Sequence, residues 1–184
     1  NYSCSLAVLV LRSAQEMLEV AREYITAIRI KAVASDDPKR SSELAAFLTH
    51  CNMQPAHLLL VLRSAMVTCF KHKNFILAAS FSRRLLELPD INSQKNAELK
   101  SKAGKVLNKA ESMGKNEHEV NYDPNTPFVI DCKEFLPIYK SRGESCVQCA
   151  FCQSNYGLAC KGILCLTCGL SEVGASTIGL VTGV

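Results

Sequence analysis

The chain has 184 residues, of which 48% are hydrophobic and 21% are charged, and its formal net charge is +4. This is the composition of a globular protein with one or two domains and a sizeable core. The charge is too small to indicate a nucleic-acid partner by itself, and no apolar run reaches the roughly 18 residues that a membrane span needs.

The first apolar run and the cysteines indicate the compartment. The run from Leu6 to Leu11 is short and precedes the first basic residue, Arg12, so the start of the chain lacks the pattern of a signal peptide. We therefore expect the ten cysteines in a reduced, cytosolic protein, where clustered cysteines indicate metal binding or catalysis rather than disulfides. Because the chain begins with Asn1 and not with Met, we expect a fragment of a longer protein.

The amino-terminal part predicts five helices. Residues 6–32 form the first, because apolar residues recur at alternating steps of four and three, as is typical of a core face or a helix–helix seam. The members of this stripe are Ala7, Leu11, Ala14, Leu18, Ala21, Ile25 and Ile28. Asp37 followed by Pro38 predicts the start of a short second helix, since Asp can cap a helix and Pro fits its first turn.

Three further helices follow in the sequence. The third is predicted from Pro55 to Lys71. The fourth ends at Pro89, after a stretch that resembles the second helix of a tetratricopeptide unit. Residues 93–113 predict a fifth, more polar helix that Gly114 terminates, and its lysines are interpreted as a solvated face.

Turn-forming and β-branched residues replace the helical period near residue 116. Two apolar runs, 128–130 and 135–139, predict a β-hairpin, because the segment between them is short enough for the runs to pair. The tail after Cys168 contains strand-like pieces separated by glycines.

These elements predict a mainly α protein with a small β-rich subdomain. Residues 1–115 would form an α-helical domain of antiparallel, solenoid-like helix pairs. Residues 116–184 would form a second domain, a cysteine-rich β unit that resembles a zinc ribbon.

A cluster of cysteines between Cys146 and Cys168 suggests a metal site. Two CxxC turns can present four thiolates to one tetrahedral zinc ion. The predicted ligands are Cys149, Cys152, Cys165 and Cys168. Gly169 would permit the tight turn after the last of them. Cys146 and Cys149 also form a CxxC pair, so the register is open, and the alternatives to structural zinc are buried free thiols and then disulfides.

The sequence offers no pattern typical of an enzyme. A cysteine nucleophile needs a base within reach, but His50 and Cys51 are neighbours on a predicted helix and face different directions. Neither a phosphate-binding Gly loop nor an HExxH motif is present. Residues 141–184 carry two basic and two acidic side chains, so counterion release on binding nucleic acid would contribute little. We therefore expect a non-enzymatic protein that presents a surface to a partner.

Four stretches, in this order, resemble the carboxy-terminal region of coatomer alpha subunits. They are FLTHCNMQPAHLLLVLRSAM, KNFILAASFSRRLLEL, NYDPNTPFVIDCKEFLPIYK and, with the CxxC pairs, CGLSEVGASTIGL. The NYDPNTPF and PIY elements are the specific ones, since neither helix nor strand propensity demands them. The resemblance extends from about Met17 to Leu180, and the starting NYSCSLAVLVL and the ending after Leu180 depart from it.

The resemblance implies a cytoplasmic scaffold region of the COPI vesicle coat in Golgi–ER traffic, peripheral on Golgi membranes and coated vesicles. It implies binding to the epsilon subunit of coatomer, a tetratricopeptide-repeat protein, and to the rest of the complex, with no nucleic acid and with the membrane reached only through the coat. The family's two cysteine pairs match Cys149/Cys152 and Cys165/Cys168, although its members vary there. The alternative function is a zinc-ribbon adaptor module for nucleic acid or another protein.

The hairpin segment is predicted to meet the epsilon-type partner. A tetratricopeptide array has a concave groove that accepts a helix or an extended segment, and aromatic side chains often anchor interfaces. The predicted partner-binding residues are Phe128, Ile130, Phe135, Ile138 and Tyr139. The alternative is that these side chains only fill the core between the helices and the sheet.

Overall fold

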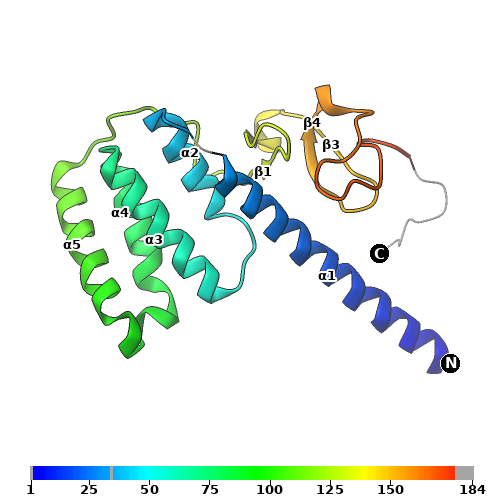
Figure 1. Cartoon of the computed structure of the whole chain (residues 1–184), viewed down its shortest axis with the longest axis horizontal. Coiled ribbons are helices and arrows are strands. Elements are labelled where there is room, and N and C mark those ends of the chain that lie inside the picture. Colours follow the sequence, from blue (N-terminus) through cyan, green and yellow to red (C-terminus); the bar gives the residue numbers. More distant parts are fainter. Residues whose placement is uncertain (1, 34, 177–184) are drawn as a thin grey trace. The chain divides into compact units, whose positions relative to one another are not determined.

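The computed structural model describes the backbone of residues 2–33 and 35–176, and the side chains in those ranges from Arg12 onward. The elements are α1 (Tyr2–Ala32), α2 (Pro38–Leu48), α3 (Pro55–Lys71), α4 (Phe75–Glu87), α5 (Ala97–Met113), β1 (Val129–Ile130), β2 (Pro137–Ile138), β3 (Cys146–Gln148) and β4 (Asn155–Gly157) (Figure 1). The predicted fold class, antiparallel helix pairs followed by a small cysteine-rich β region, is confirmed.

The chain divides into two compact units. The helical unit comprises Arg29–Tyr122, and the cysteine-rich unit combines the residues up to Ile28 with those from Asp123 onward. Helix α1 therefore contributes to both units. This grouping differs from the domains predicted at residues 1–115 and 116–184, which stay a prediction.

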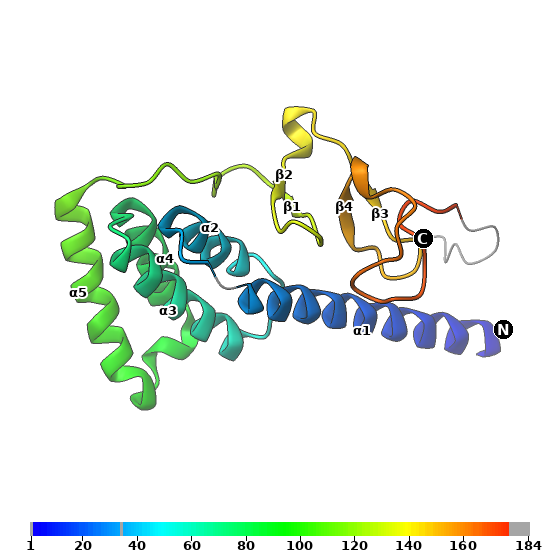
Figure 2. The ribbon, with the colours of Figure 1, turned by 45° about the horizontal axis from the view of Figure 1, so that its top comes forward.

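The helical unit is built around large apolar side chains. Helix α3 packs against α4, and α4 packs against α5 (Figure 2). The buried Ala78 and Ala79 of α4 leave room for this close approach. Tyr122, which follows α5, returns to the core and places its ring edge-on to Phe47 and beside Phe81. The core includes Ile30, Phe47, Leu62, Met66, Phe81, Leu85 and Ile91.

Capping residues explain where the helices begin and end. The Asp37 carboxylate accepts hydrogen bonds from the backbone N–H groups two and three residues later, which confirms the predicted start of α2. Gly114 ends α5 with a φ of 61°, the left-handed conformation that glycine adopts easily. Helix α4 is capped from elsewhere in the chain, because Asn116 Oδ1 accepts from the Ile76 N–H at 2.9 Å. Sequence reasoning missed this cap, since the two residues are far apart in the chain.

Asn74, which precedes α4, links α2 to the segment after α5 through its side chain. Its buried amide donates to Ser42 Oγ at 2.9 Å and accepts from the His118 N–H at 3.0 Å. We expect Asn74→Ala to lower the free energy of unfolding by about 2 kcal/mol, because the buried Ser42 hydroxyl and the half-buried His118 N–H each lose a hydrogen-bond partner. Urea unfolding followed by circular dichroism measures this. Asn96→Ala is the control, because the Asn96 side-chain amide donates to an exposed carbonyl. Equal losses of unfolding free energy in the two variants would contradict the prediction.

The apolar stripe of α1 is not packed as predicted. Its described members are exposed: Ala14, Leu18, Ala21, Ile25 and Ile28. Ala7 and Leu11 lie outside the described side chains, and the buried positions are instead Thr26, Ala27 and Ile30 on a neighbouring face. The expectation of a core face or seam is therefore wrong for the described part of the chain, because an apolar period identifies a face but not what covers it. Within the described residues, no helix is both long and apolar enough to cross a membrane.

The β part of the cysteine-rich unit consists of two antiparallel hairpins. In the first, Val129 pairs with Ile138, which confirms the hairpin predicted between the two apolar runs. In the second, Val147 pairs with Tyr156. In the tail, the backbone of Val173 forms an isolated bridge with Cys149, whereas the pieces predicted after residue 176 lie outside the described residues.

Asp131 ties the two hairpins together. Its carboxylate accepts backbone hydrogen bonds from Lys133 and Glu134 within its own turn, and a third from Gly157 of β4 at 2.7 Å. A side chain at Gly157 would place its Cβ 3.0 Å from Asp131 Oδ2, so a larger residue there would require the carboxylate to shift. This link helps to fix the position of β4, which follows the CxxC turn of Cys149 and Cys152.

Candidate metal centre

The sulfur atoms of the two predicted cysteine pairs come together. In Cys149, Cys152, Cys165 and Cys168 they all lie within 4.8 Å of one another. The Cys149 and Cys168 sulfurs are 3.7 Å apart, and those of Cys152 and Cys165 are 3.6 Å apart. Four sulfurs bound tetrahedrally at a zinc–sulfur distance of about 2.3 Å would be separated by about 3.8 Å. The four thiols therefore fit a zinc ion, and all the cysteines whose side chains are described are free of disulfides.

Each pair of sulfurs is presented by its own turn, and the two turns have the same backbone geometry. The Gln153 N–H donates to the Cys149 carbonyl at 3.0 Å, and the Gly169 N–H donates to the Cys165 carbonyl at 2.9 Å. Gln153 and Gly169 have φ values of 59° and 66°, so both turns close through a left-handed residue. The sequence indicates the second closure through its glycine, but glutamine at the first gives no such signal.

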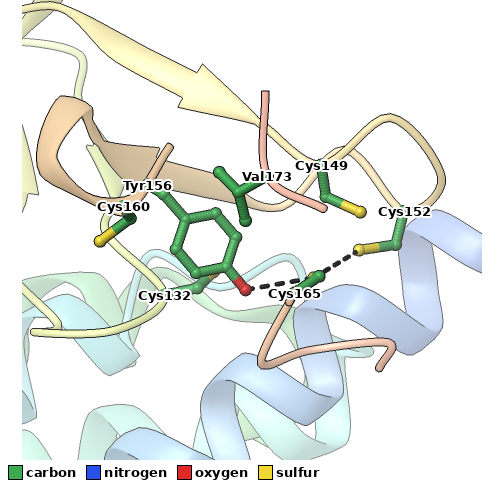
Figure 3. Close-up of a cluster of buried hydrophobic side chains, with 7 residues drawn as sticks. All are labelled: Cys132, Cys149, Cys152, Tyr156, Cys160, Cys165 and Val173. Carbon is green, nitrogen blue, oxygen red and sulfur yellow. Dashed lines mark hydrogen bonds between the residues drawn. The ribbon is translucent and has the colours of Figure 1, made fainter. Parts of the chain in front are cut away.

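Backbone pairing holds the two turns against each other. The first turn is the loop that joins β3 to β4, and the segment after the second turn pairs with it, because Val173 bridges Cys149 and the Gly174 N–H donates to the Gln148 carbonyl at 2.8 Å. The fully buried Val173 lies beside Cys149 and Tyr156 in the apolar cluster next to the sulfurs (Figure 3). From α1 of the same unit, Arg22 donates to the Cys152 carbonyl at 3.3 Å.

Hydroxyl groups reach two of the sulfurs. The Tyr156 hydroxyl lies 3.2 Å from the Cys165 sulfur. This contact is one of the dashed lines in Figure 3. The Ser154 hydroxyl lies 3.1 Å from the Cys152 sulfur. Neither contact is indicated by the CxxC spacing, and sequence reasoning missed both residues.

The surroundings give the thiols unequal acidities. Burial alone would raise the pKa of Cys165, but hydrogen bonds from Tyr156, from two backbone N–H groups and from Cys152 outweigh it and lower the pKa to about 6. Burial raises the pKa of Cys152 and of Cys168. Cys165 therefore ionises before these two, and a thiolate is the form that binds a metal.

The remaining cysteines of the region lie apart from the four-sulfur group. Cys146 is half-buried in β3 with its sulfur 3.8 Å from Asn155 Oδ1, so the geometry favours the register that starts at Cys149. Cys132 and Cys160 are buried in the apolar cluster around Tyr156.

The five predicted partner-binding residues do not form one exposed patch. Phe135, Ile138 and Tyr139 are buried, whereas Phe128 and Ile130 are half-buried. The Tyr139 hydroxyl accepts the Asp123 N–H at 2.9 Å, and its ring lies 4.1 Å from the Arg142 guanidinium carbon. Among the large hydrophobic side chains of this hairpin, Leu136, in the turn between the strands, is exposed.

His50, which sequence reasoning considered as a base, has a phenol as its partner. Its Nε2 lies 2.7 Å from the Tyr122 hydroxyl. Burial and the nearby Arg84 lower the pKa of the ring to about 4, so His50 is neutral near pH 7. This arrangement agrees with a structural role in the helical unit.

The comparison with known proteins extends over nearly the whole chain. The family model for the C-terminus of the coatomer (COPI) alpha subunit matches residues 10–183. Coatomer subunit alpha-1 of Arabidopsis thaliana is 37% identical over 91% of the chain, and coatomer subunit alpha of Dictyostelium discoideum is 39% identical over 90%. Coatomer subunit alpha of Saccharomyces cerevisiae is 33% identical over 91%. The chain spans 13–14% of the length of these relatives. With both cysteine pairs and both hairpins inside the matched residues, the chain belongs to the family formed by the carboxy-terminal regions of coatomer (COPI) alpha subunits.

Proposed function

We propose that this chain is a non-enzymatic scaffold region of the COPI vesicle coat and serves transport between the Golgi and the endoplasmic reticulum. The observation that carries the proposal is the family match over residues 10–183. The relatives at 33–39% identity are named coatomer alpha subunits, which supports a role as a coat component. A helical unit joined to a small cysteine-rich unit suits a protein that presents surfaces to partners.

The proposed partners are the epsilon subunit of coatomer and the rest of the complex. The chain would contact the rest of the complex both directly and through the epsilon subunit. The support is the resemblance of the chain to this region of coatomer alpha subunits, together with the family match. In this proposal the protein acts in the cytoplasm, peripherally on Golgi membranes and vesicles, and meets the membrane only through the coat. It binds no nucleic acid.

Within that proposal, the β1–β2 hairpin takes part in the contact with the epsilon subunit. The half-buried Phe128 and Ile130 and the exposed Leu136 offer it an apolar surface. Phe135, Ile138 and Tyr139 would support this surface from beneath, because they are buried in the chain alone.

Three aspartate substitutions test where the partner binds. Leu136→Asp changes the hairpin turn, Ile76→Asp changes α4, and Leu170→Asp changes the segment after the second cysteine turn. All three positions are exposed, at 43%, 52% and 69%, so each variant should fold. In calorimetric titrations with the epsilon subunit, we expect Leu136→Asp to weaken binding by about 1–3 kcal/mol, because a charge replaces an apolar contact. The other two variants should bind like the unmodified chain.

Each outcome of this titration has a distinct meaning. Weakening by Ile76→Asp or Leu170→Asp alone would contradict the hairpin proposal and move the contact to the helices or to the cysteine-rich turns. If the unmodified chain does not bind the epsilon subunit at all, the proposed partner is wrong.

The four clustered thiols are proposed to bind one structural zinc ion. The support is the mutual sulfur distances of at most 4.8 Å and the paired left-handed turns. Zinc would cross-link the β3–β4 loop to the second cysteine turn, which short strands alone hold weakly. Metal at this position supplies folding stability rather than chemistry.

A further inference from the structure

Tyr156 lies entirely inside the cysteine-rich unit, yet its one polar atom faces a sulfur. The side chain is fully buried, and its backbone is fixed by pairing with Val147 in the β3–β4 hairpin. The hydroxyl oxygen lies 3.2 Å from the Cys165 sulfur and 3.3 Å from Thr167 Oγ1, and it accepts the Leu166 N–H at 3.0 Å. Phenylalanine would fill the same space, so packing alone does not explain the hydroxyl.

The direction of the hydrogen bond between Tyr156 and Cys165 follows from counting protons. A phenol has one O–H donor and two lone pairs. The Leu166 N–H occupies one lone pair, and the Thr167 hydroxyl can donate to the other. A cysteine that binds a metal has lost its proton, so its sulfur can only accept. When the Thr167 hydroxyl donates to Tyr156 in the metal-bound state, the Tyr156 proton points at the Cys165 sulfur.

A donor at this position offsets an electrostatic cost. Four thiolates around a divalent zinc ion carry two net negative charges, and a buried charge is costly unless hydrogen bonds reach it. Bonds from a neutral O–H to an ionised acceptor are stronger than bonds between neutral groups. The Ser154 hydroxyl, 3.1 Å from the Cys152 sulfur, is placed to act in the same way on the facing ligand.

We propose that Tyr156 is a positioning residue of the metal centre, whose hydroxyl donates to the Cys165 thiolate and slows the loss of the metal. The proposal rests on the proposed zinc binding. Outer hydrogen-bond partners of metal ligands commonly change metal affinity by about 10- to 100-fold when they are removed. Tyr156 thus joins the four cysteines as a determinant of whether the unit stays loaded.

The test compares Tyr156→Phe with two hydroxyl deletions that leave the sulfurs untouched. Tyr139→Phe removes a phenol that accepts the Asp123 N–H in the same unit, and Thr167→Val removes the hydroxyl next to Tyr156. In chelator competition on the whole chain, we expect Tyr156→Phe to bind zinc about 10- to 100-fold more weakly and to release it faster. Both controls should stay close to the unmodified chain.

A cobalt spectrum separates positioning from mere stability. With cobalt(II) in place of zinc, the sulfur-to-metal charge-transfer band should move to lower energy in Tyr156→Phe. The reason is that the Cys165 thiolate loses the hydrogen bond that stabilises its negative charge. A residue that only packs would lower the melting temperature without moving this band. Should Tyr156→Phe fail to fold, the unmodified chain loaded with cadmium-113 provides the measurement: the Tyr156 hydroxyl proton should couple to the metal across the Cys165 sulfur.

Two results would overturn the proposal, and they differ. If the unmodified chain binds neither zinc nor cobalt, this proposal and the proposed metal site fall together. If it binds metal with a four-sulfur spectrum, but Tyr156→Phe matches it in affinity and band position, only the role of Tyr156 is wrong. Absence of the cadmium coupling in the loaded, unmodified chain would also reject that role alone.

Discussion

Replacing Cys149 and Cys165 together by serine should release the metal and unfold the cysteine-rich unit while the helical unit stays folded. One sulfur is lost from each turn, and serine is a poor zinc ligand near neutral pH because its hydroxyl stays protonated. Zinc binding contributes about 10–16 kcal/mol in small zinc-dependent folds, which is as large as the whole stability of a typical domain. The short strands of this unit cannot replace such a contribution.

The helical unit should survive because its core is built from other residues. It spans Arg29–Tyr122, and the side chains that fill it come from within that range, including Tyr122 after α5. Metal analysis should fall from about one zinc per chain to near none, and amide exchange should become fast in the cysteine-rich unit alone. Cys146→Ser is the matched control, because its sulfur lies outside the four-sulfur group.

The control also decides the register of the ligands. Zinc retained in Cys146→Ser and lost in the double variant would support the pair that starts at Cys149. Zinc lost in Cys146→Ser would contradict that register, and protein purified without chelator but free of zinc would reject the metal site. Faster amide exchange throughout the helical unit of the double variant would contradict the separation of the two cores.

The sequence predicted the helices well because their ends depend on local chemistry. Asp37, Pro55 and Gly114 act within one turn of their own position, so the starts of α2 and α3 and the end of α5 can be inferred from short stretches. The start of α5 was predicted at residue 93, but the helix begins at Ala97. The cap on α4 comes from Asn116, which depends on how the chain returns after α5. The exposed stripe of α1 was misjudged for a related reason: its apolar face is visible in the sequence, but its surroundings are not.

The candidate site divides in the same way between local and distant information. CxxC spacing predicts which sulfurs can converge, and the structure brings those four together. The hydroxyls of Tyr156 and Ser154 reach the sulfurs only because β4 pairs with β3 and closes the first cysteine turn. Nothing in the amino-acid pattern marks them, since tyrosine and serine are common in strands and turns.

Phe135→Ala and Tyr139→Ala should each lower the free energy of unfolding of the cysteine-rich unit by about 3–5 kcal/mol, the usual cost of removing a buried aromatic ring. Phe135 is 7% exposed and Tyr139 is 1% exposed. The loss of the Tyr139 ring removes its packing on Phe128 and Arg142 and leaves the Asp123 N–H without its acceptor. Denaturant unfolding that follows this unit measures the effect, and Leu136→Ala, an exposed position in the same hairpin, should cost no more than about 0.5 kcal/mol.

The same variants separate a core role from a direct contact with the epsilon subunit. If the two rings are core, binding should fall only in proportion to the unfolded fraction, and it should recover when lower temperature or added zinc restores the fold. Leu136→Asp should show the opposite behaviour, with weaker binding and an unchanged melting temperature. A Tyr139→Ala chain that melts like the unmodified protein but binds about 1–3 kcal/mol more weakly would contradict the core assignment, and would make the tyrosine itself an anchor of the interface.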